Sequence, residues 1–154
     1  MRYWMGAWLV LCSAIVAPLA MAAELSGFTP QAFPQAKLLY VDFWASWCVP
    51  CRASFPWLND MEAKYASRGL KVIGVNVDRN RTDAEAFLAR YPAQFDLLMD
   101  TRGELATRYA LQGMPSAILL RPDGTEVDRH IGFRADHIDE YEATIQQLLG
   151  EEAP

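Results

Sequence analysis

Cys48 and Cys51, two cysteines separated by two residues, are the side chains of this sequence best suited to chemistry. A pair at this spacing in an oxidising compartment forms a disulfide or works as a reactive dithiol. As a structural bridge it would be weak, because closing so short a loop stabilises a protein by only about 2 kcal/mol in the chain-entropy estimate. A zinc site would need two more ligands, and His130 and His137 fit no usual ligand spacing. The pair therefore predicts thiol–disulfide exchange without a metal or cofactor, with a passive disulfide or half of a metal site as the alternatives.

The place of the pair in the chain predicts that its two sulfurs differ. Cys48 follows an apolar run, and the residues after it form an expected helix. Cys48 would then face the unpaired N–H groups and the positive dipole end of that helix, and both favour the thiolate. The thiolate is the attacking species and the better leaving group in exchange. Cys51, one turn into the helix, should be shielded and act as the resolving thiol.

The elements that position the cysteines are expected to alternate between strand and helix. Strands are predicted at residues 38–45, 71–77 and 97–99, and a hairpin at 116–120 and 126–131 around the turn 122–124. Helices are predicted at 30–36, 49–67, 103–109 and 136–149, and another opens with the capping box Thr82–Glu85 and closes before Pro92. Pro56 should kink the long helix and Gly69 should end it. This order predicts an α/β fold, a three-layer α/β/α sandwich with a mixed central sheet.

Residues 1–22 are expected to lie outside this domain. Arg2 is the only charge before Glu24, and an apolar run leads to a small-residue site at residues 20–22, which is the pattern of a secretory signal. Cleavage would leave residues 23–154 as one domain in the periplasm. The uncharged stretch from Tyr3 to Ala23 is 21 residues long, near the length of about 20 that spans a bilayer. An uncleaved anchor is therefore the alternative, and only then would the chain contact the membrane.

The composition fits one globular domain. The 154 residues are 52% hydrophobic and 21% charged, which is typical of a folded soluble domain and not of a disordered chain. The net charge is -5, with basic residues scattered along the chain. This pattern lacks the positive footprint that a nucleic-acid backbone requires, so no nucleic-acid partner is predicted.

The sequence resembles thioredoxin in several separate motifs. The matching residues are Val41-Asp42-Phe43-Trp44-Ala45-Ser46-Trp47-Cys48-Val49-Pro50-Cys51, then Pro56, then Gly113-Met114-Pro115-Ser116 before a strand, and Gly132 after the hairpin. The segment between Asp78 and Pro115 is longer than thioredoxin needs. With its extra helix and short strand, the chain is similar to the exported TlpA/DsbE-like thiol:disulfide interchange proteins. Two departures are the short front segment from Glu24 to Lys37 and Asp42, which matches thioredoxin at a position where TlpA-like proteins often differ.

The resemblance implies a thioredoxin fold with a TlpA-like central insertion. It also implies a cis bond between Met114 and Pro115 beside the dithiol, which would expose the Met114 backbone to an extended substrate; Pro115 merely starting a strand is the alternative. Trp44 is expected in the core. Trp47 is expected on a substrate-docking rim, which would also contain Val49, Pro50 and Gly132.

Asp42 lies within an apolar strand, where burial should raise the pKa of its carboxyl and let it take the proton of Cys51. A surface aspartate on a frayed strand is the alternative. Together the residues predict an exported oxidoreductase that reduces disulfides of envelope proteins and receives electrons from a membrane thiol donor, the direction following from the TlpA-like resemblance. An oxidase or isomerase of the same fold, and a non-catalytic protein-binding module, are the other candidates.

Overall fold

The computed structural model describes residues 23–24 and 28–150 of the chain. Its centre is a six-stranded mixed sheet with the strand order β1-β4-β3-β2-β5-β6. The strands are β1 (Ala23–Glu24), β2 (Leu38–Trp44), β3 (Leu70–Asn76), β4 (Asp96–Met99), β5 (Ser116–Leu120) and β6 (Glu126–Ile131). The helices are α1 (Cys51–Tyr65), α2 (Arg81–Leu88), α3 (Glu104–Arg108) and α4 (Ile138–Leu149), with short 3-10 helices η1 (Pro30–Ala32), η2 (Ala66–Arg68) and η3 (Ala135–His137).

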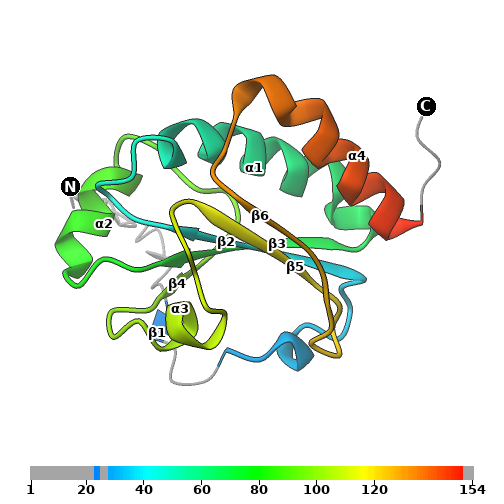
Figure 1. Ribbon diagram of the computed structural model, residues 1–154, viewed down its shortest axis with the longest axis horizontal. Helices are drawn as coiled ribbons and strands as arrows, with labels where there is room; N and C mark the ends of the chain where they lie inside the picture. Colours follow the sequence, from blue (N-terminus) through cyan, green and yellow to red (C-terminus); the bar gives the residue numbers. More distant parts are fainter. Residues whose placement is uncertain (1–22, 25–27, 151–154) are drawn as a thin grey trace, which may run out of the picture.

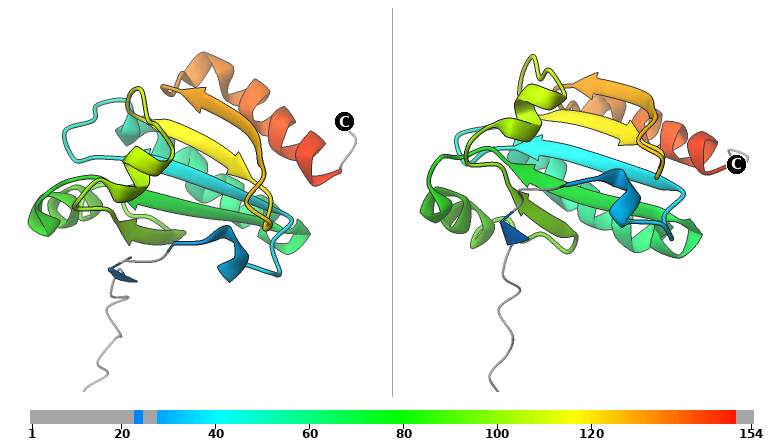
Figure 2. Two further views of the ribbon diagram at one scale, coloured as in Figure 1. Left: turned by 60° about the horizontal axis from the view of Figure 1, so that its bottom comes forward. Right: turned by 90° about the horizontal axis from the view of Figure 1, so that it is seen from below.

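The sheet separates two layers, as predicted. Figures 1 and 2 show α1, α2 and α4 over one face, and α3 with the η1 segment over the other. The apolar core divides in the same way, with one cluster under α1, α2 and α4 and a second cluster that includes Phe28 and Leu105. The expected three-layer α/β/α sandwich with a mixed sheet is confirmed.

Strand β2 is buried along its whole length because it lies between two strands and under both layers. It runs parallel to β3 and antiparallel to β5. Leu38, Tyr40 and Trp44 face the α1 side, and the alternating residues Leu39, Val41 and Phe43 face the other cluster. Since side chains alternate along a strand, Asp42 belongs to the α1 side.

Helix α1 starts directly after β2 and follows the prediction closely. Its buried face includes Phe55, Leu58, Met61 and Tyr65, and Pro56 lies within it. After η2 the chain turns at Gly69, which has a φ of 108°. A Cβ there would lie 2.8 Å from the Cγ of Lys37, so both the backbone conformation and the close approach require glycine.

Two helix predictions were wrong. The expected helix at 30–36 is only the 3-10 turn Pro30–Ala32, because Pro34 has no N–H to continue a helical ladder. Helix α2 begins at Arg81 after an extended Asn80, so Thr82 lies inside the helix and does not cap it. Asn80 is at least as good an N-terminal residue as threonine, and its side chain donates to Asp83 Oδ2 at 3.3 Å. The helix also ends at Leu88, before Pro92.

The insertion between Asp78 and Pro115 contains α2, β4 and α3, as expected. Strand β4 extends the sheet by pairing in parallel with β3, and the two-residue β1 pairs with β4 at the edge. Helix α2 lies beside the first turns of α1, where the Phe87 ring packs 4.8 Å from Trp44 and 5.0 Å from Phe55. The insertion therefore adds a wall next to the start of α1.

Residues 1–22, on which the secretory-signal and anchor predictions fall, lie outside the described part of the chain. Across residues 23–24 and 28–150, no helix combines the length and the apolar character needed to cross a membrane.

Candidate redox site

Cys48 and Cys51 form a disulfide in the connection between β2 and α1, with their Cα atoms 5.4 Å apart. The N–H of Cys51, the first residue of α1, donates a hydrogen bond to Cys48 Sγ at 3.3 Å. The sulfur of Cys48 thus occupies the place where a helix N-terminus offers an unpaired donor. In the reduced protein the same N–H and the helix dipole would stabilise a Cys48 thiolate.

Both cysteines are buried, whereas the residues next to Cys48 are open to solvent. Cys48 is 3% exposed and Cys51 is 0% exposed. Trp47 and Val49, which flank Cys48, are 65% and 64% exposed, and Pro50 is also exposed. A partner can therefore contact an apolar rim around Cys48, while Cys51 is covered.

A buried polar cluster holds the loop in front of the disulfide. The carboxylate of Asp78 accepts the Ser46 N–H at 2.8 Å and the Ser46 hydroxyl at 2.9 Å. The amide of Asn76 donates to the same carboxylate at 2.8 Å, and the Asp78 N–H donates to Asn76 Oδ1 at 3.0 Å. Sequence reasoning missed this cluster, although two polar residues at the carboxyl end of an apolar strand were a signal for it.

Asp42 is buried on the α1 side of β2, with 2% of its surface exposed. Its Oδ2 atom is enclosed and has no hydrogen-bond partner in the described structure. Its sheet neighbours, Gly74 on β3 and Ala117 on β5, have no polar side chain to offer. Burial raises the pKa of the Asp42 carboxyl well above its ordinary value, so the carboxyl holds a proton more tightly than an exposed aspartate does.

The segment before β5 lies at the same edge of the sheet as the disulfide. Ser116 pairs with Phe43, so Met114 and Pro115 continue beyond β5 next to the end of β2. The Met114–Pro115 bond is cis, which confirms that expectation. Gly132 donates its N–H to the Pro115 carbonyl at 2.8 Å. Within residues 28–150 the backbone of Met114 has no hydrogen-bond partner, so it is available to another chain.

A hydrogen-bonded chain connects this edge to the core. Tyr40 and His130 Nε2 lie 2.6 Å apart, and His130 Nδ1 lies 3.2 Å from the Gly132 carbonyl oxygen. Because a carbonyl only accepts, Nδ1 carries the hydrogen and Nε2 accepts from the Tyr40 hydroxyl. Burial lowers the pKa of His130 and raises that of Tyr40, so each neutral form is favoured. The sequence suggested His130 only as a possible metal ligand, and this contact was not predicted.

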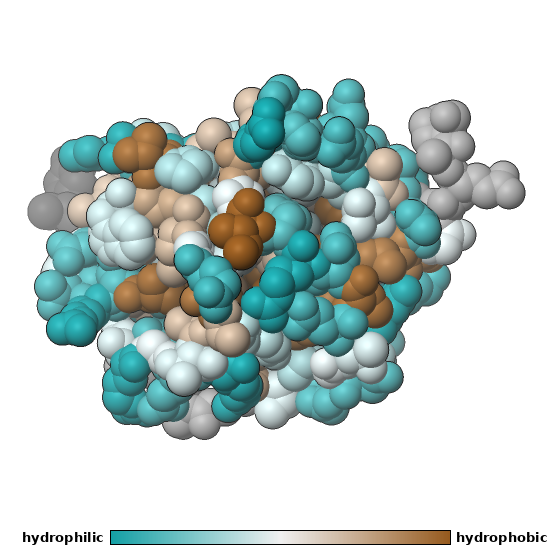
Figure 3. Space-filling view, in the orientation of Figure 1, coloured by the Kyte–Doolittle hydropathy of each residue, from teal (hydrophilic) through white to brown (hydrophobic). Residues whose placement is uncertain are grey.

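Large hydrophobic side chains are exposed at the end of the sheet where the disulfide loop begins. In the described structure they are Trp47, Val49 and Ile131, and Ile131 directly precedes Gly132. On the face drawn in Figure 3, hydrophobic residues appear only as small separate areas among hydrophilic ones. Trp47 and Val49 flank Cys48, whereas Ile131 lies two strands away on β6, with its side chain next to Gly113.

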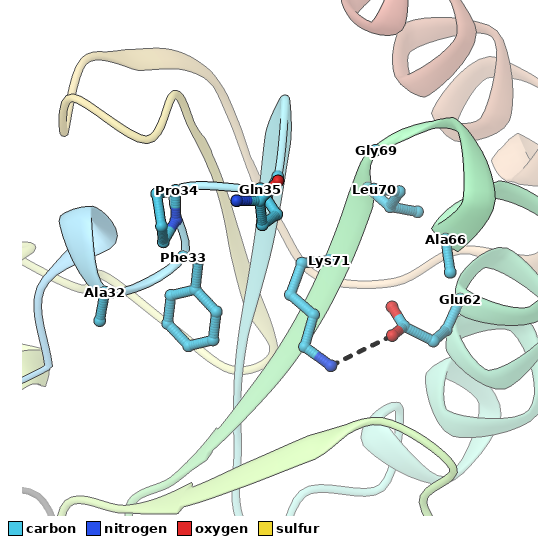
Figure 4. A pocket seen from close by; sticks show the side chains of 10 residues that line it. Ala32, Phe33, Pro34, Gln35, Glu62, Ala66, Gly69, Leu70 and Lys71 are labelled. Atoms are coloured by element: carbon cyan, nitrogen blue, oxygen red, sulfur yellow. Dashed lines mark hydrogen bonds and ion pairs between the residues drawn. The ribbon is translucent and has the colours of Figure 1, made fainter.

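A hollow of about 360 Å³ lies away from these residues, between the segment before β2 and the end of α1. Figure 4 shows Lys71 on its wall pointing toward Glu62, and the ion pair between them is 3.2 Å long. Since β2 and α1 place the disulfide at their other ends, this hollow contains none of the predicted site residues. Its charged groups pair with each other.

A sequence model of the Redoxin family matches residues 4–145. The chain belongs to this family. The thiol-disulfide oxidoreductase ResA of Oceanobacillus iheyensis is 30% identical over 90 residues, which cover 58% of this chain and 47% of the relative. A ResA protein of Bacillus cereus is 27% identical over 116 residues, or 75% of this chain and 62% of the relative. The matched region thus spans about half to three fifths of these curated Redoxin-like relatives.

Solved structures agree on the fold. A candidate thiol:disulfide interchange protein DsbE from Chlorobium tepidum is 42% identical with a TM-score of 0.72, covering 75% of this chain and 82% of that one. StoA from Bacillus subtilis is 26% identical with a TM-score of 0.60, covering 70% and 84%. This Redoxin-family chain therefore has a thioredoxin-like fold and is similar to TlpA/DsbE-like thiol:disulfide proteins, as the sequence predicted.

Proposed function

We propose that this chain is a thiol:disulfide oxidoreductase that reduces disulfides in other proteins. The observation that carries the proposal is the Cys48–Cys51 disulfide at the first residue of α1, with Cys48 Sγ on a helix N–H and an exposed apolar rim around it. The names of the ResA and DsbE relatives support the reaction class. The direction, from dithiol to substrate, rests on the TlpA-like resemblance.

The reaction begins with the reduced protein. The Cys48 thiolate attacks one sulfur of a substrate disulfide, so that a Cys48–substrate bond forms and the substrate S–S bond breaks. The first substrate thiolate leaves and takes a proton from solvent. Cys51 then gives its proton to the Asp42 carboxylate and attacks Cys48 Sγ, and the second substrate thiolate leaves. Two electrons pass to the substrate, and the Cys48–Cys51 disulfide seen in the structure is the product.

Asp42 is suited to the proton step by its place and by its acidity. It lies on the side of β2 that faces the buried Cys51, and burial raises its pKa. A carboxylate in such surroundings binds a proton more strongly than an exposed one, so it draws the proton from a thiol more effectively. Afterwards the proton leaves with the substrate thiolate.

The docking surface for the substrate has two sides. Trp47, Val49 and Pro50 form one side, and the segment Met114–Pro115 with Gly132 forms the other. An extended substrate can pair with the free Met114 backbone by the mode in which a strand adds to an exposed edge. Because backbone contacts are independent of side chains, this surface accepts many proteins.

The cell envelope is the proposed location. The secretory pattern of residues 1–22 would export the domain to the periplasm, either released or held by an anchor. In that oxidising compartment a reductant needs a supply of electrons, and a membrane thiol donor would return two electrons to the disulfide after each turnover. Envelope proteins with disulfides would be the substrates.

The reduction of insulin by dithiothreitol tests the activity, because the reduced chains precipitate. The wild-type protein should accelerate precipitation, and a variant with Cys48→Ser should not. A non-catalytic binding module would leave the rate unchanged. The equilibrium potential in a glutathione or dithiothreitol buffer then tests the direction, since thioredoxin lies near about -270 mV and the oxidant DsbA near about -120 mV. A value at the oxidising end would reject the reductant proposal.

A further inference from the structure

A second hollow, of about 230 Å³, opens beside the redox site between the start of α1 and helix α2. Ser46 and Arg52 line it on the side of the disulfide loop, and Phe87 and Arg90 line it on the α2 side. Ser46 is two residues before Cys48, and Arg52 directly follows Cys51. We call this hollow the arginine pocket.

The walls of the arginine pocket are fixed by buried contacts. Ser46 is held through both its N–H and its hydroxyl by the buried carboxylate of Asp78. Phe87 is buried against the rings of Trp44 and Phe55. Ser46 and Phe87 therefore form fixed parts of the wall, whereas Arg52 and Arg90 are exposed side chains at its mouth.

The charge of the pocket is not neutralised within the described structure. Lys64, Lys71, Arg129 and Arg134 each form an ion pair with a carboxylate. The guanidinium groups of Arg52 and Arg90, in contrast, have no ion pair or hydrogen bond to any residue in 28–150.

One carboxylate, that of Asp83, is among the lining residues, and it accepts a hydrogen bond from Asn80. Arg79 and Arg81, which flank the start of α2, also have no ion pair in the described part of the chain. The pocket wall itself carries two guanidinium groups against one carboxylate, although the whole chain has a net charge of -5.

Guanidinium groups bind carboxylates through two parallel hydrogen bonds, and such charge-assisted pairs are stronger than neutral ones. We propose that the arginine pocket is a subsite for an acidic side chain of the substrate protein, close in sequence to the cysteine that Cys48 attacks. This inference rests on the proposed function and adds a preference to it: the apolar rim accepts an extended chain, and the pocket selects chains with a glutamate or aspartate beside the cysteine.

Disulfide-linked peptides that differ at one position test the preference. Three fluorescent peptides carry Glu, Gln or Lys next to the reactive cysteine, and kcat/KM is measured for their reduction by the full chain. The wild-type protein should reduce the Glu peptide about two- to fivefold faster than the Gln peptide, the gain expected from a partly exposed ion pair, and the Lys peptide slowest. In Arg90→Gln and in Arg52→Gln the Glu/Gln ratio should fall toward one.

The ratio of two peptides is the readout because a change in Cys48 reactivity affects both peptides and cancels. Lys37→Gln is the matched control, since it removes one exposed positive charge just before β2, at the end of the strand away from the disulfide, and should leave the ratio unchanged. Raising the salt to about 0.5 M should lower the wild-type ratio, because salt screens exposed charges.

The outcomes separate the two proposals. If the wild-type protein reduces the Glu and Gln peptides equally well, the pocket inference is overturned and the oxidoreductase proposal stands. A ratio that survives both arginine substitutions, or that falls equally in Lys37→Gln, also overturns the pocket. If no peptide is reduced, the proposed function itself fails.

Discussion

The phenolic oxygen of Tyr40, in the centre of the sheet, lies 2.6 Å from Nε2 of His130 on the edge strand β6. Nδ1 of the same ring donates a hydrogen bond to the Gly132 carbonyl oxygen. The N–H of Gly132 in turn donates to the carbonyl oxygen of Pro115. The substrate-facing edge is therefore tied to the core through one neutral imidazole.

Replacing Tyr40 by Phe should destabilise the protein by about 1 kcal/mol, the usual net value of one buried hydrogen bond. The phenylalanine ring would keep the packing against Trp57, whose ring centroid is 5.7 Å away, but the imidazole would lose its donor. Urea unfolding of the two proteins measures the difference. Equal midpoints would show that the hydroxyl contributes nothing to stability.

The His130 ring also predicts a pH dependence of stability. Burial lowers its pKa, so in the acidic range the unfolded chain binds a proton more readily than the folded protein. The free energy of unfolding should then decrease as the pH falls below about 6.5 and stop decreasing once the folded protein is protonated too. In His130→Ala this dependence should become flatter.

His137→Ala is the matched control, because this second histidine pairs with Glu140 at the surface and has no contact with Gly132. Urea midpoints at several pH values between about 4 and 8 compare the variants. The proposed linkage is rejected if His130→Ala keeps the wild-type slope.

Asp42→Asn should stabilise the protein at neutral pH and slow the resolving step. The carboxyl is buried, one of its oxygens has no hydrogen-bond partner, and burial raises its pKa. In the unfolded chain the carboxyl ionises at about pH 3.9, whereas the folded protein keeps it protonated to a higher pH. The wild-type protein consequently loses this part of its stability as the pH rises through the folded pKa. The stability curves of wild type and variant should approach each other below pH about 4.

Single-turnover exchange with a disulfide substrate measures the kinetic half of this prediction. Release of the second substrate thiol should be slower in Asp42→Asn, while the first attack by Cys48 is unchanged. A less stable variant with wild-type kinetics would refute the proton role.

The reduced protein should contain one acidic and one inaccessible thiol. In the disulfide form the N–H of Cys51 donates a hydrogen bond to Cys48 Sγ. The same N–H should stabilise the thiolate of reduced Cys48, so the pKa of Cys48 should lie clearly below the free-thiol value of about 8.5. Cys51, which is fully buried, should resist alkylation. Iodoacetamide rates across pH give both values, and equal reactivity of the two thiols would contradict the assignment.

Trapping separates the roles of the two sulfurs most directly. Cys51→Ser should form mixed disulfides with its substrates and fail to release them, whereas Cys48→Ser should capture almost nothing. Non-reducing gels should show adducts of the first variant that disappear with dithiothreitol, and mass spectrometry would identify the partners. Capture by Cys48→Ser alone, or by both variants equally, would reverse or remove the assigned roles.

Local patterns in the sequence were sufficient for most of the elements. The apolar run of β2, the Cys48–Cys51 spacing and the hairpin turn each fall within one short segment, and the hairpin strands have the predicted bounds. The errors occurred at the end of one short helix and at the start of another. At Pro34 a proline limits the helix, and at Asn80 two neighbouring residues could both cap one.

The contact between Tyr40 and His130 could not be predicted, because it depends on register across three strands. Asp42 pairs with Ala117 and Ala117 pairs with His130, which places the imidazole on the same face as Tyr40. A shift of one residue in either pairing would turn His130 to the opposite face. The anchoring of Ser46 by Asp78, across 32 residues, was inaccessible for a similar reason.

Strand β2 is hydrogen-bonded on both sides and buried under both layers, and it ends where the disulfide loop begins. Amide hydrogens in such a strand exchange with solvent only when the whole domain opens, so β2 should belong to the slowest-exchanging part of the protein. The sulfur chemistry consequently takes place at the end of the strand that should be the most protected from hydrogen exchange. Oxidation and reduction can change the covalent state of Cys48 and Cys51 while the backbone behind them keeps its protection.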